Sequence, residues 1–290
     1  MVIVWGEVNF WSGDPPKFAS SWDECIQKCL ELADCYLIDD NLNSECRIFN
    51  YGSAPMVLKK DKAYGTKVGF KRVLSSCPAD GSLAPLFAED NLKDGFTETY
   101  KSGPLAYQIT IYSGIPNDIA PYRWAFDDRY FIQCPSDSLV SFRDTNKVCI
   151  SIRQFSDPPS QNRTFGADLC SGNGAMGLTG PYSEDEMTTI SDYFIPQLKE
   201  EIDTTKFGYF GIWTDGTRTK VEDFQLTDNT LDTVTYNALL RKDSKFEYDD
   251  GLCCFLVFVK DQNTEFWVFL CEDEAYSRAA MCRMEPLIQR

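Results

Sequence analysis

Twelve cysteines and no histidine among 290 residues constrain this chain more than any other feature. No two cysteines form a Cys-x-x-Cys pair, so zinc ribbons and thioredoxin-like redox motifs find no support. The absence of histidine removes the commonest metal ligand and the commonest general base. Disulfides are the remaining use for so many thiols, and they imply an oxidising, extracellular compartment. The cysteines are Cys25, Cys29, Cys35, Cys46, Cys77, Cys134, Cys149, Cys170, Cys253, Cys254, Cys271 and Cys282.

Charge and hydropathy narrow the possible partners. The chain has 28 Lys+Arg against 44 Asp+Glu, a formal net charge of −16. Such a surface repels nucleic acid, heparin-like polymers and anionic membranes, so we expect no nucleic-acid partner. Solubility alone explains the charge, and weak attraction of cations or basic partners is the alternative. No run of about 18 apolar residues occurs, so we also expect no membrane span.

Two features bear on secretion. The segment from Met1 to Trp5 has neither the basic start nor the long apolar stretch of a signal peptide. We therefore expect either a mature form or a start that lies further upstream. The triplet Asn162-Arg163-Thr164 is an N-glycosylation sequon, which predicts a glycan at Asn162 and fits secretion.

Residues 1–73 read as one small unit. A capping box, Ser21 with Glu24 three residues on, opens a predicted helix. Apolar residues then recur at helical spacing, and Cys25 and Cys29 lie one turn apart on the same buried face. Short apolar segments read as strands that cover the helix, at residues 2–5, 36–38, 46–51 and 67–71.

The order of motifs in this unit is distinctive. It runs from Trp5-Gly6 through the Ser21 to Cys25 helix start and the next three cysteines to Val68-x-Phe70-Lys71. It resembles the PAN/apple-like domain that is common in nematode secreted proteins, sometimes called the CW domain. In that family two nested bridges pin the helix to the sheet. Carried over by position, the resemblance implies the bridges Cys25–Cys46 and Cys29–Cys35.

Residues 74–133 read as a linker followed by a β-rich N-terminal extension of a second domain, which spans 134–284. In this domain Cys134 and Cys149 bracket a predicted hairpin, and a short helix ends at Cys170. A second capping box opens a further helix at Ser183. The predicted strands and hairpin arms lie at 107–112, 122–126, 210–213, 254–259 and 266–270.

The second domain resembles a C-type lectin-like domain. The matched features are Cys134-Pro135, the helix ending at Cys170, the capping-box stretch, a strand containing Trp213 and the ending from Cys271 to Cys282. The resemblance implies the bridges Cys134–Cys149 and Cys170–Cys282, and a third from Cys271 to Cys253 or Cys254. We take Cys254–Cys271, which leaves Cys77–Cys253 as the last pair by even parity. The fold class is then α+β: an apple-like helix on an antiparallel sheet, followed by a mixed, disulfide-rich lectin-like domain.

The sequence contains few of the motifs that are typical of enzymes. Gly172 to Gly177 fits G-x-G-x-x-G, but a helix precedes it and a strand follows, the reverse of a dinucleotide site. Serine and cysteine nucleophiles lack an imidazole partner, and Gly-x-Ser-x-Gly is absent. We expect no enzyme, no cofactor and no resident metal. Four acidic clusters read as solvated surface or helix capping, at 39–40, 184–186, 249–250 and 272–274.

Calcium-dependent sugar binding is also not expected. Sugar-binding lectin-like domains carry a Glu-Pro-Asn or Gln-Pro-Asp triplet in the long loop, yet the corresponding stretch 224–251 has no proline. The strand before Cys271 is apolar and offers no ligand oxygen. Trp213 and Trp267 are expected in the core rather than stacked on sugar. The loop residues with oxygen ligands that could assemble a different calcium site are Asp228, Asn229, Asp232, Asp243, Asp249 and Asp250.

Taken with the two resemblances, these features predict an extracellular recognition protein that binds glycan or protein ligands without calcium. The alternative is a matrix or structural interaction protein that recognises no sugar. The two differ in whether a glycan array shows any binding.

Overall fold

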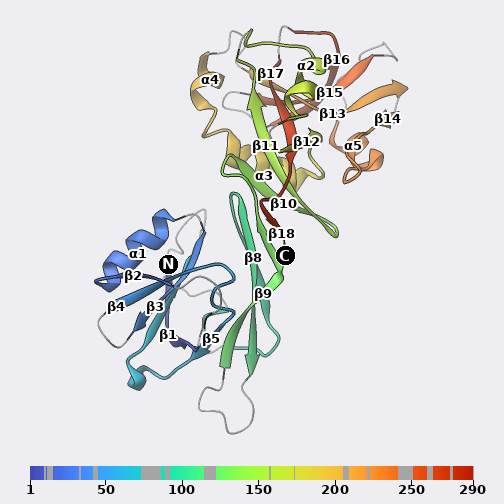
Figure 1. Ribbon diagram of the computed structural model, residues 1–290. Coiled ribbons are helices and arrows are strands. Elements are labelled where there is room, and N and C mark those ends of the chain that lie inside the picture. The colour runs from blue at the N-terminus through green and yellow to red at the C-terminus, as the bar shows by residue number, and fades with distance from the viewer. Residues whose placement is uncertain are drawn as a thin grey trace. The chain divides into compact units, whose positions relative to one another are not determined.

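A computed structural model describes residues 1–9, 11, 16–32, 34–41, 45–72, 86–88, 92–113, 122–156, 158–172, 174–204, 209–220, 223–240, 251–259, 264–274 and 277–289. The chain divides into two compact units (Figure 1). The first unit is Met1–Ile132 with Ile288–Arg290, and the second unit is Gln133–Leu287. Both are rich in strands.

The first unit is built on one large sheet. Its strands pair in the order β2-β4-β3-β6-β1-β5-β9-β8-β7, and β18 adds to β9. The strands are β1 (Val2–Val8), β2 (Lys17–Ala19), β3 (Cys35–Asn41), β4 (Glu45–Asn50), β5 (Met56–Lys59), β6 (Lys67–Phe70), β7 (Thr97–Ser102), β8 (Leu105–Ser113), β9 (Tyr122–Gln133) and β18 (Ile288–Gln289). The helices are α1 (Trp22–Glu31) and the short 3₁₀ helix η1 (Lys62–Tyr64).

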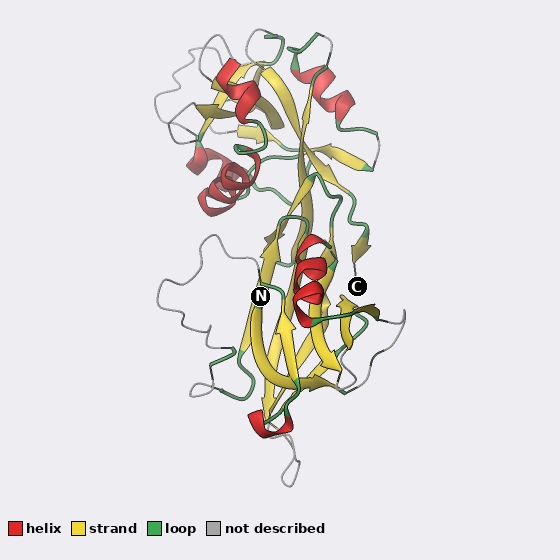
Figure 2. Cartoon of the chain, turned by 90° about the vertical axis from the view of Figure 1, so that its left-hand side faces the viewer, coloured by secondary structure: helices red, strands yellow, loops and turns green. Residues whose placement is uncertain are grey.

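Helix α1 lies across one face of this sheet (Figure 2). Ser21 is its N-cap and accepts a hydrogen bond from the Glu24 amide, as the capping box predicts. Cys25 and Cys29 are fully buried beneath the helix and bond to Cys46 on β4 and Cys35 on β3. These are the pairs that the PAN/apple resemblance implies.

The opposite face of the sheet carries the main core of the first unit. Residues of the first 72 positions, such as Phe70, pack there against Ile109 on β8 and Trp124 on β9. The Trp124 indole donates to the Leu86 carbonyl at 2.9 Å, which ties a segment between β6 and β7 to the same core. The compact unit therefore continues past residue 73 to Ile132, because β7 to β9 join the first sheet rather than the second unit.

The second unit holds the other sheet, in the order β10-β11-β17-β13-β15-β16, with β12 on β17 and β14 on β13. The strands are β10 (Ser138–Arg143), β11 (Asn146–Gln154), β12 (Ala175–Leu178), β13 (Tyr209–Lys220), β14 (Asp223–Gln225), β15 (Leu252–Val259), β16 (Glu265–Leu270) and β17 (Ser277–Met284). The helices are α2 (Arg163–Leu169), α3 (Glu184–Phe194), α4 (Lys199–Thr204) and α5 (Thr233–Leu239).

Several predicted elements of the second unit are present. The Cys134–Cys149 hairpin is β10–β11, and the late hairpin is β15–β16, both antiparallel. Ser183 caps α3 by accepting from the Glu186 amide at 3.1 Å. The glycine-rich stretch runs from the end of α2 into β12, the helix-to-strand order that excludes a dinucleotide fingerprint.

The two tryptophans of this unit differ. Trp213 is buried, and its indole donates to the Gln161 carbonyl at 2.8 Å. Trp267 is half-buried and donates to Glu265 at 2.8 Å, so its expected place in the core is wrong. Strand alternation explains the difference, because Phe266 and Val268 take the core side of β16.

Five disulfides join described residues. Cys134–Cys149 and Cys170–Cys282 are the pairs that the lectin-like resemblance implies. The third bridge of this unit is Cys253–Cys271, so the choices of Cys254–Cys271 and Cys77–Cys253 are wrong. Cys254 is buried as a free thiol, and Cys77 lies outside the described residues.

Strand geometry gives the reason for this pairing. Neighbouring residues of β15 point to opposite faces, and Cys254 faces the core with Leu252 and Leu256. Cys253 faces the other side of the sheet, and its cross-strand neighbour there is Phe269 on β16. Cys271 comes two residues after Phe269, so it reaches the same side as Cys253. Burial raises the pKa of the Cys254 thiol well above its usual range, which keeps it protonated and unreactive.

We predict that Cys254 reacts with a thiol reagent only after unfolding. Titration without reductant, in native buffer and in denaturant, measures this. Cys254→Ala lowers the denatured thiol count by one if Cys254 is free. An unchanged or higher count shows that Cys254 is bridged in the protein.

We also predict that residues 1–73 alone do not give a cooperative thermal transition when oxidised, whereas residues 1–132 do. The shorter fragment loses Ile109, Trp124 and Phe131, so it exposes to water the apolar residues that pack against them, such as Phe70. Melting of both fragments by circular dichroism tests this. A cooperative melt of the shorter fragment places the boundary at residue 73 after all.

Candidate recognition surface

Strand alternation in β4 places a charged side chain on the sheet face away from α1. Cys46 and Ile48 point toward the helix, so Arg47 and Phe49 point to the other side. The register sets Arg47 opposite Asp39 on β3 and opposite Phe18 on the edge strand β2. Residues from three strands therefore meet at one edge of the sheet.

Asp39 and Arg47 form a two-point ion pair. Asp39 is 1% exposed, and its Oδ1 accepts from Arg47 Nε at 2.7 Å. Arg47 Nη2 also bonds to Asp39 Oδ2. Burial raises the pKa of Asp39, and the hydrogen bonds and charge of Arg47 oppose that rise. Two parallel bonds hold the guanidinium plane in one orientation.

Aromatic rings flank this fixed guanidinium. Arg47 Cζ lies 4.8 Å from the centroid of the Trp11 ring and 5.5 Å from that of Phe49. Trp11 is 44% exposed and Phe18 is 52% exposed, so both present ring surface to solvent. We call Trp11, Phe18, Asp39 and Arg47 the aromatic–arginine surface.

Such a surface suits ligand recognition. Trp and Arg dominate the binding energy of protein interfaces, and a ring that is already immobilised loses little entropy on binding. The open ring faces suit apolar contact with a sugar ring or with a partner side chain. The Asp39 carboxylate accepts two hydrogen bonds from Arg47, so both of its oxygens are engaged within the described part of this surface.

No motif in the sequence marks this surface. The Asp39-Asp40 pair reads as a solvated acidic cluster, and that expectation is wrong for Asp39, which is buried and paired with Arg47. One signal was present: Arg47 stands between the buried Cys46 and Ile48 in an alternating strand, which points it away from the helix. Its pairing with Asp39 across the sheet and its contact with Trp11 depend on the tertiary structure.

The loop residues considered above as calcium ligands have protein partners where the structure describes them. Asp228 bonds to Arg143 and Arg283, and Asn229 accepts from Arg283 at 3.1 Å. Asp232 caps α5 by accepting from the Thr235 amide. Asp243, Asp249 and Asp250 lie outside the described residues. Within the described ranges, no three His, Cys, Asp or Glu residues form a group suited to a metal.

Arg143 at the end of β10 is the centre of a buried charge network in the second unit. Its side chain is 0% exposed and pairs with Glu186 at 3.0 Å and Asp228 at 3.3 Å. It also donates to the Thr179 hydroxyl and the Gly180 carbonyl. The network thereby joins β10, α3 and the segment that follows β14.

Asp228 is the acidic member that holds this segment. Burial by itself would raise its pKa, but hydrogen bonds from Thr179 and Thr230 and the charge of Arg143 lower it below the ordinary value. A carboxyl whose pKa is lowered on folding stabilises the fold above its unfolded pKa. That stabilisation is lost as pH falls through the folded value.

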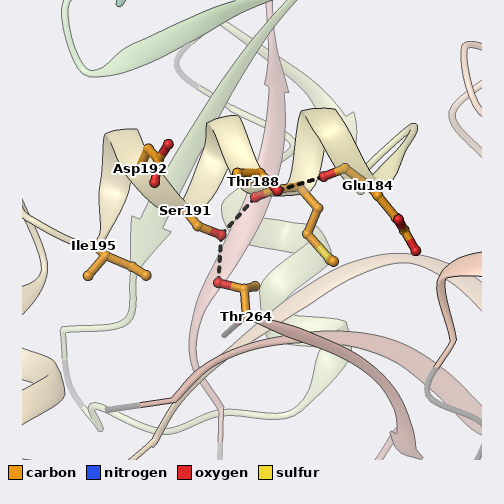
Figure 3. Close-up of a pocket in the computed structure, with 7 residues that line it drawn as sticks. Glu184, Thr188, Ser191, Asp192, Ile195 and Thr264 are labelled. Carbon is orange, nitrogen blue, oxygen red and sulfur yellow. Dashed lines mark hydrogen bonds between the residues drawn. The ribbon is translucent and has the colours of Figure 1, made fainter. Parts of the chain in front are cut away.

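A pocket of about 410 Å³ lies beside α3 (Figure 3). The Ser191 hydroxyl bonds to the Met187 carbonyl at 2.7 Å and to the Thr264 hydroxyl at 2.5 Å. Thr188 donates to the Glu184 carbonyl at 3.0 Å. The described partners of the Ser191 hydroxyl are thus a carbonyl and another hydroxyl, and neither is a basic group.

We predict that Arg143→Leu destabilises the protein by about 3–5 kcal/mol, because Glu186 and Asp228 are left buried without a counter-charge. Urea unfolding at pH 7 measures the change. Lys199→Leu removes the same charge from an exposed position and should stay within about 0.5 kcal/mol. Equal changes in the free energy of unfolding for the two substitutions would contradict a stabilising role for the Arg143 network.

Comparison with known proteins bears on the first unit. Residues 1–72 match the PAN-like domain family. A search of curated proteins finds no match to the chain. Among the described residues, no helix is both long enough and apolar enough to cross a membrane. PAN domains mediate protein or carbohydrate interactions. Residues 1–72 therefore form a PAN-like domain, and the aromatic–arginine surface lies entirely within it.

Proposed function

We propose that this chain is an extracellular recognition protein without enzymatic activity, which binds a glycan or protein ligand without calcium. The observation that carries the proposal is the aromatic–arginine surface on the PAN-like domain. Its rings are exposed, its charge is fixed, and the module that holds it is of a kind that mediates protein or carbohydrate interactions.

The disulfides support the extracellular part of the proposal. Five bridges spread over both units form and persist only where thiols are oxidised. They contribute stability chiefly by restricting the unfolded chain.

The second unit is proposed to be a C-type lectin-like domain, joined to the PAN-like domain as in nematode secreted proteins. The bridges Cys134–Cys149, Cys170–Cys282 and Cys253–Cys271 support this, since they follow the order of bridges in that family. Calcium independence is supported by Asp228, whose oxygens are already used by Arg143, Arg283 and neighbouring hydroxyls.

A protein ligand is the second candidate, as for a matrix interaction protein that recognises no sugar. One contact favours it. Arg47 directs Nε and Nη2 to Asp39, which leaves fewer donors for the hydroxyl groups that fix a sugar in place. Ring contact with a partner side chain needs no such donors.

We predict that Trp11→Ala weakens ligand binding at least about tenfold, since truncating a hot-spot aromatic costs about 2 kcal/mol or more. Binding of the full chain is measured on a glycan array and against purified matrix proteins. Tyr64→Ala is the matched control, because Tyr64 is 53% exposed in the same domain but outside the surface. EDTA should change neither result.

The outcomes separate the candidates. Glycan binding lost in Trp11→Ala supports sugar recognition, and binding to a matrix protein alone supports the protein ligand. Equal loss in Trp11→Ala and Tyr64→Ala, or full binding by both, contradicts a role for the aromatic–arginine surface. Loss of binding in EDTA contradicts calcium independence.

A further inference from the structure

Asn162 is the N-cap of α2, and the oxygen and the nitrogen of its side-chain amide have different partners. Oδ1 accepts from the backbone amides of Thr164 at 3.1 Å and Phe165 at 3.3 Å. Nδ2 points the other way and donates to Glu274 at 3.3 Å, on the exposed side. The capping role therefore falls on the oxygen and leaves the nitrogen at the surface.

The same residue begins Asn162-Arg163-Thr164, the single N-glycosylation triplet in the sequence. Thr164 is exposed, and so is the Phe165 ring at 51%. The cap, the sequon and an exposed apolar ring thus share one turn of α2.

We propose that Asn162 carries an N-linked oligosaccharide, and that α2 is built to keep its N-cap when the sugar is attached. The donor class is an oligosaccharide linked through diphosphate to a lipid. Nδ2 bonds to the anomeric carbon as the bond from that carbon to the diphosphate oxygen breaks. The lipid diphosphate leaves with the bonding electron pair, and Nδ2 loses one proton to a base.

The product keeps what the helix needs. Oδ1 is untouched by the transfer, so both backbone amides stay capped. Nδ2 retains one hydrogen, so it can still donate one hydrogen bond, as it does to Glu274 before the transfer. The attached glycan leaves from the solvent side, in the turn that exposes Phe165.

This inference rests on the proposed function only for its compartment, since the donor is present in the secretory route. The test expresses the full chain behind a cleavable secretion signal in eukaryotic cells, and both the secreted and the retained protein are examined. Treatment with a peptide N-glycosidase should remove a mobility shift from the wild-type chain and leave an aspartate at position 162.

Two substitutions at Thr164 separate modification from structure. The Thr164 amide, not its side chain, bonds to Asn162, so Thr164→Ala keeps the cap and abolishes the sequon. Thr164→Ser keeps both. The shift should vanish in Thr164→Ala and persist in Thr164→Ser, with thermal stability alike in the unglycosylated forms. Asn162→Ala should lose both the shift and stability, through the missing cap.

A wild-type chain that enters the secretory route without a glycosidase-sensitive shift overturns the proposal, as does a shift that survives Thr164→Ala. Loss of stability in Thr164→Ala that matches Asn162→Ala overturns the separation of cap and glycan. Binding in the Trp11 assay is read on the same preparations. A glycosylated chain without ligand binding counts against the proposed function alone, and a binding chain without glycan counts against this inference alone.

Discussion

The cross-linking of α1 to one face of the first sheet is the constraint on which the rest of that unit depends. Cys25 and Cys29 are buried between helix and sheet and bond to two different strands. With that face closed, alternate residues of β3 and β4 are directed to the other side. There they divide between a core completed by β8 and β9 and an open edge where Arg47 and Trp11 meet.

The charge pairs of the two units have different structural roles. Near the sheet edge, Asp39 fixes Arg47 beside the exposed Trp11 ring, so the pair forms part of a surface. In the second unit Arg143 is wholly buried, and its bonds reach Glu186 and Asp228 from separate elements. A buried pair of this kind adds little net stability over apolar packing, but breaking it is costly. Its effect is to hold the segment after β14 in one place.

That segment is where a lectin-like fold would place calcium ligands. The carboxylate of Asp215 accepts the backbone amides of Thr227 and Asp228, and Asp228 is committed to arginines. Oxygens engaged with cations of the protein itself are poor ligands for a hard metal ion. The proposed recognition chemistry rests instead on the exposed aromatic rings of the PAN-like domain, and the proposed glycan rests on Asn162, the N-cap of α2.

Local signals in the sequence determined much of this protein. Capping boxes at Ser21 and Ser183 marked two helices, cysteine spacing with the family resemblances implied four bridges, and two apolar runs marked the late hairpin. Only tertiary structure decided the rest. Cys253 and Cys254 are adjacent in sequence, and the face of β15 that each takes selects the partner of Cys271. The first unit extends to residue 132 because strands far along the chain complete its sheet. Strand register places Arg47 opposite Asp39, and packing brings Trp11 against it. Neither contact follows from a local sequence pattern.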